Sequence, residues 1–378
     1  NDSFHLGYPA CSFCIDINIE VNVMRIVLAI DSFKGCLSSV EVESSVEKGV
    51  KLSCPQAEVE KIPVSDGGDG MLEVFSQLVG CEKVTVACHD ALMRPIQAEY
   101  AISPSGVVVL ETAVACGINL LKSEELNPLR ATSYGVGEVI ADALLRGYHS
   151  YIIGLGGSAT SDCGLGMLAA LKRKLGEDWQ NKLPKDLDII LASDVANPLF
   201  GDTGAAVVFG PQKGATPEMI TCLDRRARTF ARLAAKHFGF DHSEDKGAGA
   251  AGGLGYAFLQ FLGAKIKSGA DVMLQMSGFE NLVKEADLIV TGEGRADAQT
   301  LMGKIPECVL AYGKRLGVPV VLLAGQVKDK TALLSAGFSQ VCCINPTALP
   351  LVEAMVPSVA KENIRKTVMR KFKGWLDL

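Results

Sequence analysis

A glycine-rich stretch, Gly154-Leu155-Gly156-Gly157-Ser158-Ala159-Thr160-Ser161-Asp162-Cys163-Gly164, joins two apolar runs at 151–153 and 165–171. The first run predicts a buried strand and the second a helix, which makes the stretch a turn at a helix N-terminus. Glycines let the backbone approach an anion closely, and the free N–H groups of a helix N-terminus point at it. The stretch matches neither G-x-x-x-x-G-K-[ST] nor G-x-G-x-x-G, so a phosphate site and an ordinary turn capped by Ser or Asp both stay open.

A strand–helix–strand unit is expected near the start of the chain. Apolar runs at 25–30 and 59–64 predict two strands, and a helix is expected at 38–51 between them. Ser38 and Glu41 have the spacing of a capping box at the start of that helix. Ligands of such units bind at the carboxyl ends of the strands, so the polar loops that follow each strand are candidates for a site.

The remaining pattern predicts an α/β protein of two domains. Further strands are predicted at 83–86, 97–102, 106–111, 187–192, 205–209, 287–290, 319–323 and 340–344. Further helices are predicted at 71–79, 133–146, 217–237, 305–316 and 351–372. We expect a discontinuous Rossmann-like three-layer domain from 24–64 and 286–378, with a second α/β domain with a mixed sheet inserted at 65–285. Residues 1–23 are interpreted as an N-terminal extension that is not necessarily native.

Length and composition fit this organisation. The chain has 378 residues, of which 48% are hydrophobic and 21% charged, with 39 glycines and a net charge of −6. More than one hydrophobic core is usual at this length, and the acidic balance argues against nucleic acid or an anionic membrane as partner. No apolar run approaches the roughly 20 residues of a membrane span. Twelve scattered cysteines favour a reducing, cytoplasmic location, and monomer or homodimer stays undecided.

Acidic residues recur where the predicted strands end. They are Asp31, Asp66, Asp69, Asp194, Glu293 and Asp297. Carboxylates beside glycine turns suit Mg²⁺, and one of them could accept a proton from an attacking hydroxyl. Lys34 and Arg295 lie in the same loops and could bind a phosphate or a carboxylate. The alternatives are a solvated loop lysine and a structural pair between Arg295 and a neighbouring carboxylate.

These residues favour an enzyme of phosphoryl transfer, because that reaction needs positioning, metal and cationic groups more than a covalent nucleophile. Two rival classes are kept open. A nicotinamide-dependent hydroxy-acid oxidoreductase would need a dinucleotide fingerprint after the first strand, where Asp-Ser-Phe-Lys-Gly stands instead. A non-catalytic sensor of nucleotide or sugar acid would tolerate loss of the carboxylates that this chain keeps.

Seven ordered blocks resemble bacterial glycerate kinases of the two-domain, non-MOFRL type, the glycerate 2-kinase family. The blocks are 29–35, 63–70, 154–160, 194–199, 209–215, 249–255 and 291–300. The resemblance implies transfer of the ATP γ-phosphate to D-glycerate with Mg²⁺, and 2-phosphoglycerate is the favoured product. A 3-phosphoglycerate-forming enzyme, or a kinase for another small hydroxy acid, is the alternative.

Roles follow as hypotheses. Asp194, Lys34 and Arg295 are the expected catalytic residues. The substrate would be bound by Ser32, Asp66, Asp69 and Asp297, and Mg²⁺ by Asp66 and Asp194. Backbone N–H groups of two glycine blocks would hold the nucleotide phosphates: Gly156, Gly157, Ser158, Ala159, Thr160, Gly249, Gly252 and Gly253.

The chain departs from the family pattern at two turns. His89-Asp90-Ala91-Leu92-Met93-Arg94-Pro95 stands where the family usually has a turn like Gly-Pro-Leu-Gly-Arg-Pro. Asp162-Cys163-Gly164 replaces a turn like Asp-Gly-Gly. Both changes remove glycines, so both put the shape of the loop in question.

Overall fold

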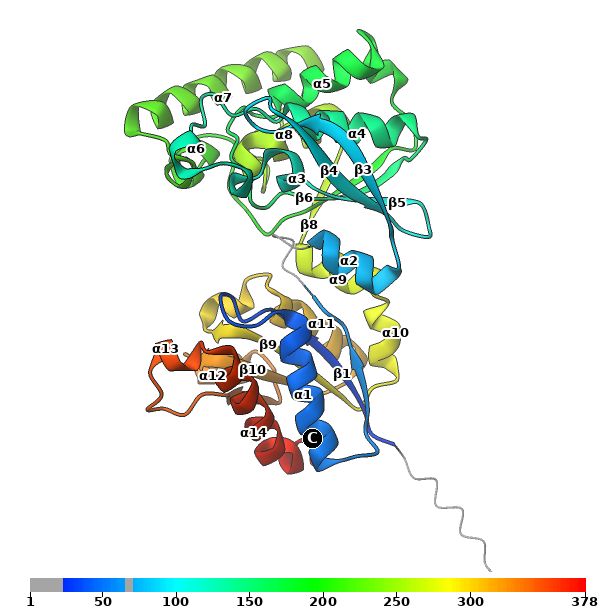
Figure 1. Ribbon diagram of the computed structural model, residues 1–378, viewed down its shortest axis with the longest axis vertical. Helices are drawn as coiled ribbons and strands as arrows, with labels where there is room; N and C mark the ends of the chain where they lie inside the picture. Colours follow the sequence, from blue (N-terminus) through cyan, green and yellow to red (C-terminus); the bar gives the residue numbers. More distant parts are fainter. Residues whose placement is uncertain (1–22, 65–70) are drawn as a thin grey trace, which may run out of the picture.

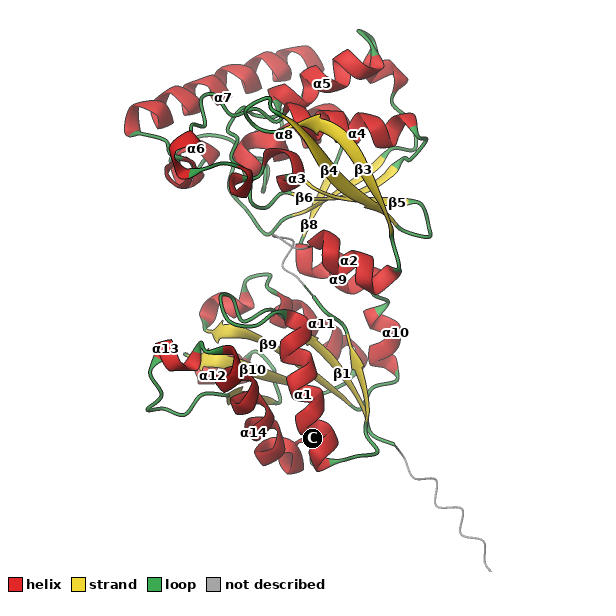
Figure 2. Ribbon diagram, in the orientation of Figure 1, coloured by secondary structure: helices red, strands yellow, loops and turns green. Residues whose placement is uncertain are grey.

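A parallel sheet built from both ends of the chain forms one domain of the computed structural model, which describes residues 23–64 and 71–378. Within the described residues this sheet has five strands, in the order β11 (Gln340–Cys343), β10 (Val320–Val327), β9 (Leu288–Ala296), β1 (Arg25–Ile30) and β2 (Glu58–Lys61). Helices cover both faces (Figure 2). The predicted three-layer, Rossmann-like domain is therefore confirmed.

The sequence of β1 explains why both faces need cover, since its residues are apolar without alternation. Ile26, Leu28 and Ile30 pack towards α1 (Ser39–Ser53) and α14 (Pro357–Trp375), whose packed pair is seen in Figure 1. Val27 and Ala29 pack on the opposite face, towards α11 (Ile305–Leu316).

The strand order creates a switch point between β1 and β9. From β1 the chain passes through α1 to β2 on one side, and from β9 it passes through α11 to β10 on the other. These two connections lie on opposite faces of the sheet, so they diverge and leave a crevice at the carboxyl ends of β1 and β9. Ligands of open α/β sheets bind in such crevices.

The second domain holds a mixed sheet, as predicted. Over the described part of the chain its order is β3 (Glu82–His89), β4 (Pro95–Ile102), β5 (Val107–Glu111), β6 (Ser150–Gly154), β7 (Asp188–Ala192) and β8 (Lys265–Lys267). The strands from β3 to β5 pair antiparallel and those from β5 to β8 pair parallel. One face packs against α4 (Tyr134–Leu145), α5 (Leu165–Leu175) and α8 (Ala250–Leu262).

The other face packs against α2 (Met71–Val79) and α9 (Gly269–Met276), which lie between the two sheets in Figure 1. Val272 and Met273 of α9 join the core beneath the second sheet, whereas Ala270 and Leu274 join a core of the first domain. One helix thus packs into both domains. The next helix, α10 (Phe279–Lys284), packs into the first-domain core although it falls inside the predicted insertion 65–285.

The remaining elements are short, apart from one long helix at the surface. The α-helices are α3 (Ala113–Cys116), α6 (Ala205–Phe209), α7 (Pro217–Phe238), α12 (Lys330–Ser335) and α13 (Leu351–Ala354). The 3₁₀ helices are η1 (Ile118–Leu120), η2 (Ser123–Glu125), η3 (Trp179–Lys182), η4 (Pro211–Lys213) and η5 (Ala298–Leu301). None of the helices in residues 23–64 and 71–378 combines the length and apolar character needed to cross a membrane.

Three local predictions were wrong. Residues 205–209 form helix α6 instead of a strand, because a short apolar run between glycines has no period that separates the two structures. Strands β9 and β10 continue through the predicted loops, since Gln326 and Val327 pair in parallel with Arg295 and Ala296. The predicted C-terminal helix is divided into α13 and α14, with Pro357 opening the second helix.

Both departures from the family pattern keep a backbone shape that favours glycine. Met93 has φ of 63° and Cys163 has φ of 55°, each in the left-handed region. Asp90 stabilises the first turn, because its Oδ1 accepts hydrogen bonds from the N–H groups of Leu92 and Arg94 at 2.8 and 2.9 Å. The turns are therefore retained at a steric cost of about 1–2 kcal/mol for each non-glycine residue.

We expect Gly49→Ala to destabilise the first domain. A Cβ at Gly49 would lie 2.8 Å from Val368 Cβ, where α1 crosses α14. Overpacking of this kind costs about 1–3 kcal/mol. Gly374→Ala is the matched control, because its Cβ would meet only Gln340 Nε2 at 3.5 Å and alanine favours a helix. Calorimetry should show a lower melting temperature for the first variant only, and equal melting of the two would contradict this packing.

Candidate active site

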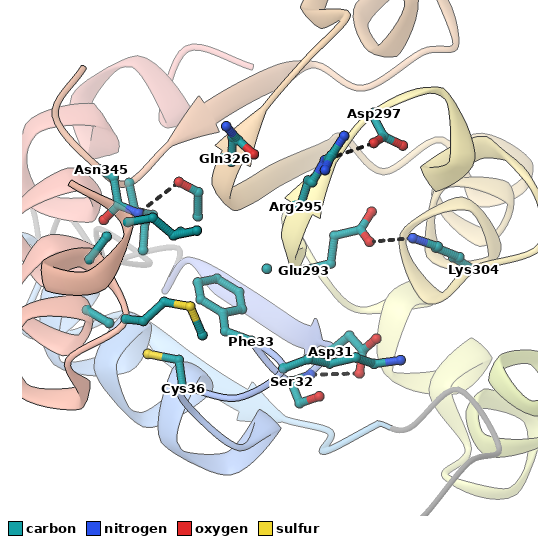
Figure 3. Close-up of a pocket in the computed structure, with 18 of the residues that line it drawn as sticks. Asp31, Ser32, Phe33, Cys36, Glu293, Arg295, Asp297, Lys304, Gln326 and Asn345 are labelled. Atoms are coloured by element: carbon teal, nitrogen blue, oxygen red, sulfur yellow. Dashed lines mark hydrogen bonds and ion pairs between the residues drawn. The ribbon is translucent and has the colours of Figure 1, made fainter. Parts of the chain in front are cut away.

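A cavity of about 580 Å³ opens at the carboxyl ends of β1 and β9. The loop after β1, the end of β9, the turn into α11, the ends of β10 and β11, and helix α13 surround it (Figure 3). Its polar and charged lining consists of Asp31, Ser32, Lys34, Glu293, Arg295, Asp297, Gln299, Lys304, Gln326 and Asn345. The crevice expected from the strand order is thus a real pocket with a charged end.

At the charged end of the pocket, two side-chain hydrogen bonds hold Glu293 in place. Its carboxylate is buried and accepts hydrogen bonds from Thr300 Oγ1 at 2.6 Å and Lys304 Nζ at 3.0 Å. Charge-assisted bonds of this type fix side chains more firmly than neutral ones. Glu293 therefore holds the Lys304 ammonium at the wall of the pocket.

Arg295 is held by Asp297, as one of the sequence alternatives expected. Arg295 Nε lies 3.1 Å from Asp297 Oδ2, and Asp297 Oδ1 accepts a hydrogen bond from Gln299 N–H at 2.9 Å. The Arg295 side chain is still 55% exposed, and a guanidinium has five N–H donors. The pair orients Arg295 and leaves donors for an anion.

The loop after β1 places the other predicted residues at the same end. Asp31 N–H donates to Gly292 O at 3.0 Å, and Asp31 Oδ1 accepts from Ser32 N–H at 2.7 Å. Phe33 is buried and Lys34 exposed, because a bridge between Phe33 and Leu37 closes the loop into a tight turn. Asp31, Ser32, Lys34, Arg295 and Asp297 are therefore brought together, as the strand-end rule predicted.

Sequence reasoning missed four polar residues of the pocket: Gln299, Lys304, Gln326 and Asn345. Gln326 and Asn345 lie at the carboxyl ends of β10 and β11, so the rule applied to the acidic residues would have found them. Lys304 precedes α11 in sequence, and only the fold shows that it reaches Glu293.

Asp194 lies in the second domain, on the loop after β7, and does not line this pocket. Its Oδ1 accepts a hydrogen bond from Gly269 N–H, at the start of the bridging helix α9, at 3.3 Å. The adjacent Ser268 Oγ donates to Gly303 O at 3.3 Å, next to Lys304 of the pocket. Asp194 is thus positioned at the junction of the two domains. Asp66 and Asp69 lie outside the described residues.

The two glycine blocks pack against each other inside the second domain. A Cβ at Gly252 would lie 1.9 Å from Thr160 O, and one at Gly249 would lie 2.2 Å from Pro198 O. Protein atoms thus fill the space on the Cβ side of Gly249, Gly252 and Gly253. Ser158, Ala159 and Thr160 are buried too. Gly156 is half-buried and Gly157 is exposed. The phosphate role expected of all eight residues in the two blocks stays a prediction.

The sequence of the whole chain was compared with known proteins. The model of the glycerate kinase family matches residues 26–188 and 177–375. The chain belongs to the glycerate kinase family. The chain is similar to the glycerate kinase of Bacillus subtilis (strain 168), with 38% identity over 354 residues, which are 88% of this chain and 93% of that protein.

Two further comparisons agree with this membership. The glycerate 2-kinase of Escherichia coli (strain K12) is 38% identical over 333 residues, covering 82% of this chain and 87% of that protein. A crystal structure described as glycerate kinase 2 from Salmonella typhimurium LT2 superposes with a TM-score of 0.78. That structure is 36% identical and covers 94% of this chain and 100% of its own. As a member of the family, this chain is a kinase that phosphorylates glycerate with ATP as the donor.

A buried lysine supports the glycine turn of this glycerate kinase family member. Lys213 is 2% exposed, and its Nζ donates to Ser158 Oγ at 3.0 Å and to Thr160 O at 2.7 Å. Burial lowers the pKa of Lys213 to about 8, although the nearby Asp162 carboxylate favours the charged form. Asp162 itself caps the adjoining helices, since its Oδ2 accepts from Ser133 N–H and Gly166 N–H. The first glycine block is therefore a rigid, internally bonded turn.

No group of three or more Asp, Glu, His or Cys side chains suited to a metal occurs in the part of the chain that the structure describes. Mg²⁺ in kinases is bound by one or two carboxylates together with substrate phosphates and water, so it does not require such a group. Exposed Asp194 offers one carboxylate of that kind.

The burial of Lys213 predicts a pH-dependent stability. In the unfolded chain its pKa returns to 10.5, so between about pH 8 and pH 10.5 the unfolded state binds more protons than the folded state. Stability then rises with pH across this interval. Relative to Lys213→Met, the free energy of unfolding should rise by up to roughly 3 kcal/mol in urea titrations. A stability difference between the two proteins that does not change between about pH 8 and pH 10.5 would contradict the lowered pKa of Lys213.

Proposed function

We propose that this glycerate kinase transfers the γ-phosphoryl group of ATP directly to the 2-hydroxyl of D-glycerate, with Mg²⁺, and releases ADP and 2-phosphoglycerate. The observation that carries the proposal is the charged end of the β1/β9 pocket, where Lys34, Arg295 and Lys304 meet. Phosphoryl transfer spreads negative charge over the oxygens of the moving group, and fixed cations stabilise that charge.

In the proposed reaction the glycerate hydroxyl oxygen attacks the γ-phosphorus in line, and the bond from that phosphorus to the β–γ bridging oxygen breaks. Asp194 accepts the hydroxyl proton, a role that its exposed carboxylate at the domain junction supports. Arg295 and Lys34 bind the glycerate carboxylate or the transferring group, with Ser32 and Asp297 at their side.

Mg²⁺ would offset the charge of the phosphates as a Lewis acid. Asp194 and Asp66 are the proposed protein ligands, and both offer the carboxylate oxygens that this hard cation prefers. The ion pairs of the pocket have a separate task. Because Glu293 holds Lys304 and Asp297 holds Arg295, these cations are oriented before the substrates arrive.

We expect Arg295→Ala and Lys34→Ala to lower kcat by about 10²–10³-fold, in the range found for loss of one group that stabilises transition-state charge. Both side chains are exposed, so the melting temperature should change little. Arg315→Ala is the matched control, because Arg315 is 56% exposed and also pairs with a carboxylate, Glu280, away from the pocket. A fall in melting temperature without a selective loss of turnover would make Arg295 and Lys34 structural residues.

The identity of the product shows which hydroxyl group of glycerate is phosphorylated. Phosphorus NMR of a reaction with ATP, Mg²⁺ and D-glycerate should show the signal of 2-phosphoglycerate. A 3-phosphoglycerate signal would retain the kinase and reverse the orientation of the acceptor. Absence of any phosphoglycerate, with ATP consumed only when another hydroxy acid is supplied, would overturn the assigned acceptor.

A further inference from the structure

The β1/β9 pocket has a second, apolar half that the proposed chemistry does not use. Its wall is formed by the loop after β1, the end of β11, α13 and the first turn of α14. The apolar side chains are Phe33, Cys36, Ile344, Leu351, Ala354, Met355 and Ala360. Among the described lining residues, every charged side chain comes from the loop after β1, from the end of β9 or from the segment that joins β9 to α11. The pocket is therefore two-sided, apolar at one end and charged at the other.

Figure 3 shows this division directly, with Cys36 and Asn345 on the side away from Lys304 and Asp297. Met355 is 37% exposed and Leu351 70% exposed, so part of this apolar surface faces the open pocket. A ligand that covers large apolar side chains at a pocket wall removes their surface from water, and this burial lowers the free energy of binding. The apolar half therefore offers exposed apolar surface that an apolar group of a ligand would cover.

The size of the pocket excludes glycerate as its whole occupant. A volume of 580 Å³ lies within the roughly 300–1,000 Å³ of sites that enclose drug-sized ligands. Glycerate is a short, fully polar acid that would leave the apolar half of the pocket empty. The remaining volume leaves room for a larger ligand that has one apolar part and one anionic part.

A fixed amide completes the apolar half. Asn345 Nδ2 donates to Gly325 O at 2.9 Å, and Asn345 Oδ1 accepts from Asn363 Nδ2 at 3.0 Å. These bonds set the orientation of the amide at the edge of the apolar wall. An amide has two N–H donors and an oxygen with two lone pairs, so one donor and one lone pair remain for the edge of a heterocycle. Asparagine pairs with adenine through such a donor and acceptor.

We infer that the apolar half of this pocket, between Phe33, Ile344 and Met355, binds the adenine base of ATP and directs its phosphates to the charged end. The inference rests on the proposed function for the identity of the donor. It places the nucleotide in the first domain, whereas the sequence pattern placed its phosphates at glycine blocks of the second domain. Glycerate would then approach from the domain junction, where Asp194 lies.

The first test narrows the apolar half without altering a charge. Ala354→Leu adds bulk at the pocket wall, and Ala332→Leu on α12 is the matched control, because Ala332 is exposed and does not line the pocket. Ala354→Leu should raise the KM for ATP by about tenfold to a hundredfold, the scale of a steric clash. The KM for glycerate and inhibition by inorganic tripolyphosphate, which has no base, should stay at the control values. An ATP KM equal to that of Ala332→Leu would overturn the inference.

The second test uses the unmodified chain and so does not depend on how a variant folds. Photolabelling with 8-azidoadenosine triphosphate, followed by peptide mapping, should mark residues 33–36 or 344–360, and excess ATP should prevent the labelling. Labelling within 154–164 or 249–255 would overturn the inference and return the base to the second domain.

Failure of the two proposals is distinguishable. If glycerate is not phosphorylated but the label still maps to 344–360, the base site stands and the assigned reaction falls. If 2-phosphoglycerate forms while the label maps elsewhere, the reaction stands and the base site falls.

Discussion

Parallel pairing of β1 with β9 is the contact on which the rest of this molecule depends. It joins segments 262 positions apart, and a buried hydrogen bond from Thr291 Oγ1 to Ala29 O, at 2.7 Å, fixes them side by side. The next residue, Gly292, packs so closely on β10 that a Cβ would lie 2.2 Å from Leu323 O. This pairing joins segments from both ends of the chain in one sheet. It also makes the crevice that gathers the loop of Asp31 and Lys34 with the strand of Glu293 and Arg295.

The pocket is arranged so that its cations are oriented but not neutralised. Lys304 and Arg295 each pair with one carboxylate, while a large part of each side chain stays exposed. Such pairing does not prevent the cations from binding an anionic ligand, because an ammonium or guanidinium keeps further N–H donors after one pair has formed. The bridging helix α9 extends this arrangement to the second domain. Asp194 accepts a hydrogen bond from Gly269 N–H, at the first residue of α9, and Ser268 just before it donates to Gly303 O beside the pocket.

The glycine blocks illustrate a general ambiguity. A missing Cβ permits an anion to approach the backbone, and it equally permits another segment of backbone to approach. At Gly252 the neighbour is Thr160 O, and at Gly255 it is Gly247 O, so both positions serve close packing of the chain on itself. The two uses leave the same residue pattern. Burial in the folded protein separates them, and burial at these positions depends on segments that are distant in sequence.

The sequence by itself determined the class of fold, the elements and the residues at strand ends, because these depend on local periodicity and capping. The capping box of Ser38 and Glu41, the buried strand β1 and the mixed second sheet were all predicted correctly. The strand-end rule also named five of the residues that line the pocket, Asp31, Lys34, Glu293, Arg295 and Asp297. Only the tertiary structure decided which strand ends meet, that Asp194 lies at the domain junction outside the pocket, and that Lys304 reaches Glu293. Those facts depend on strand pairing and packing between distant segments, and no local pattern records them.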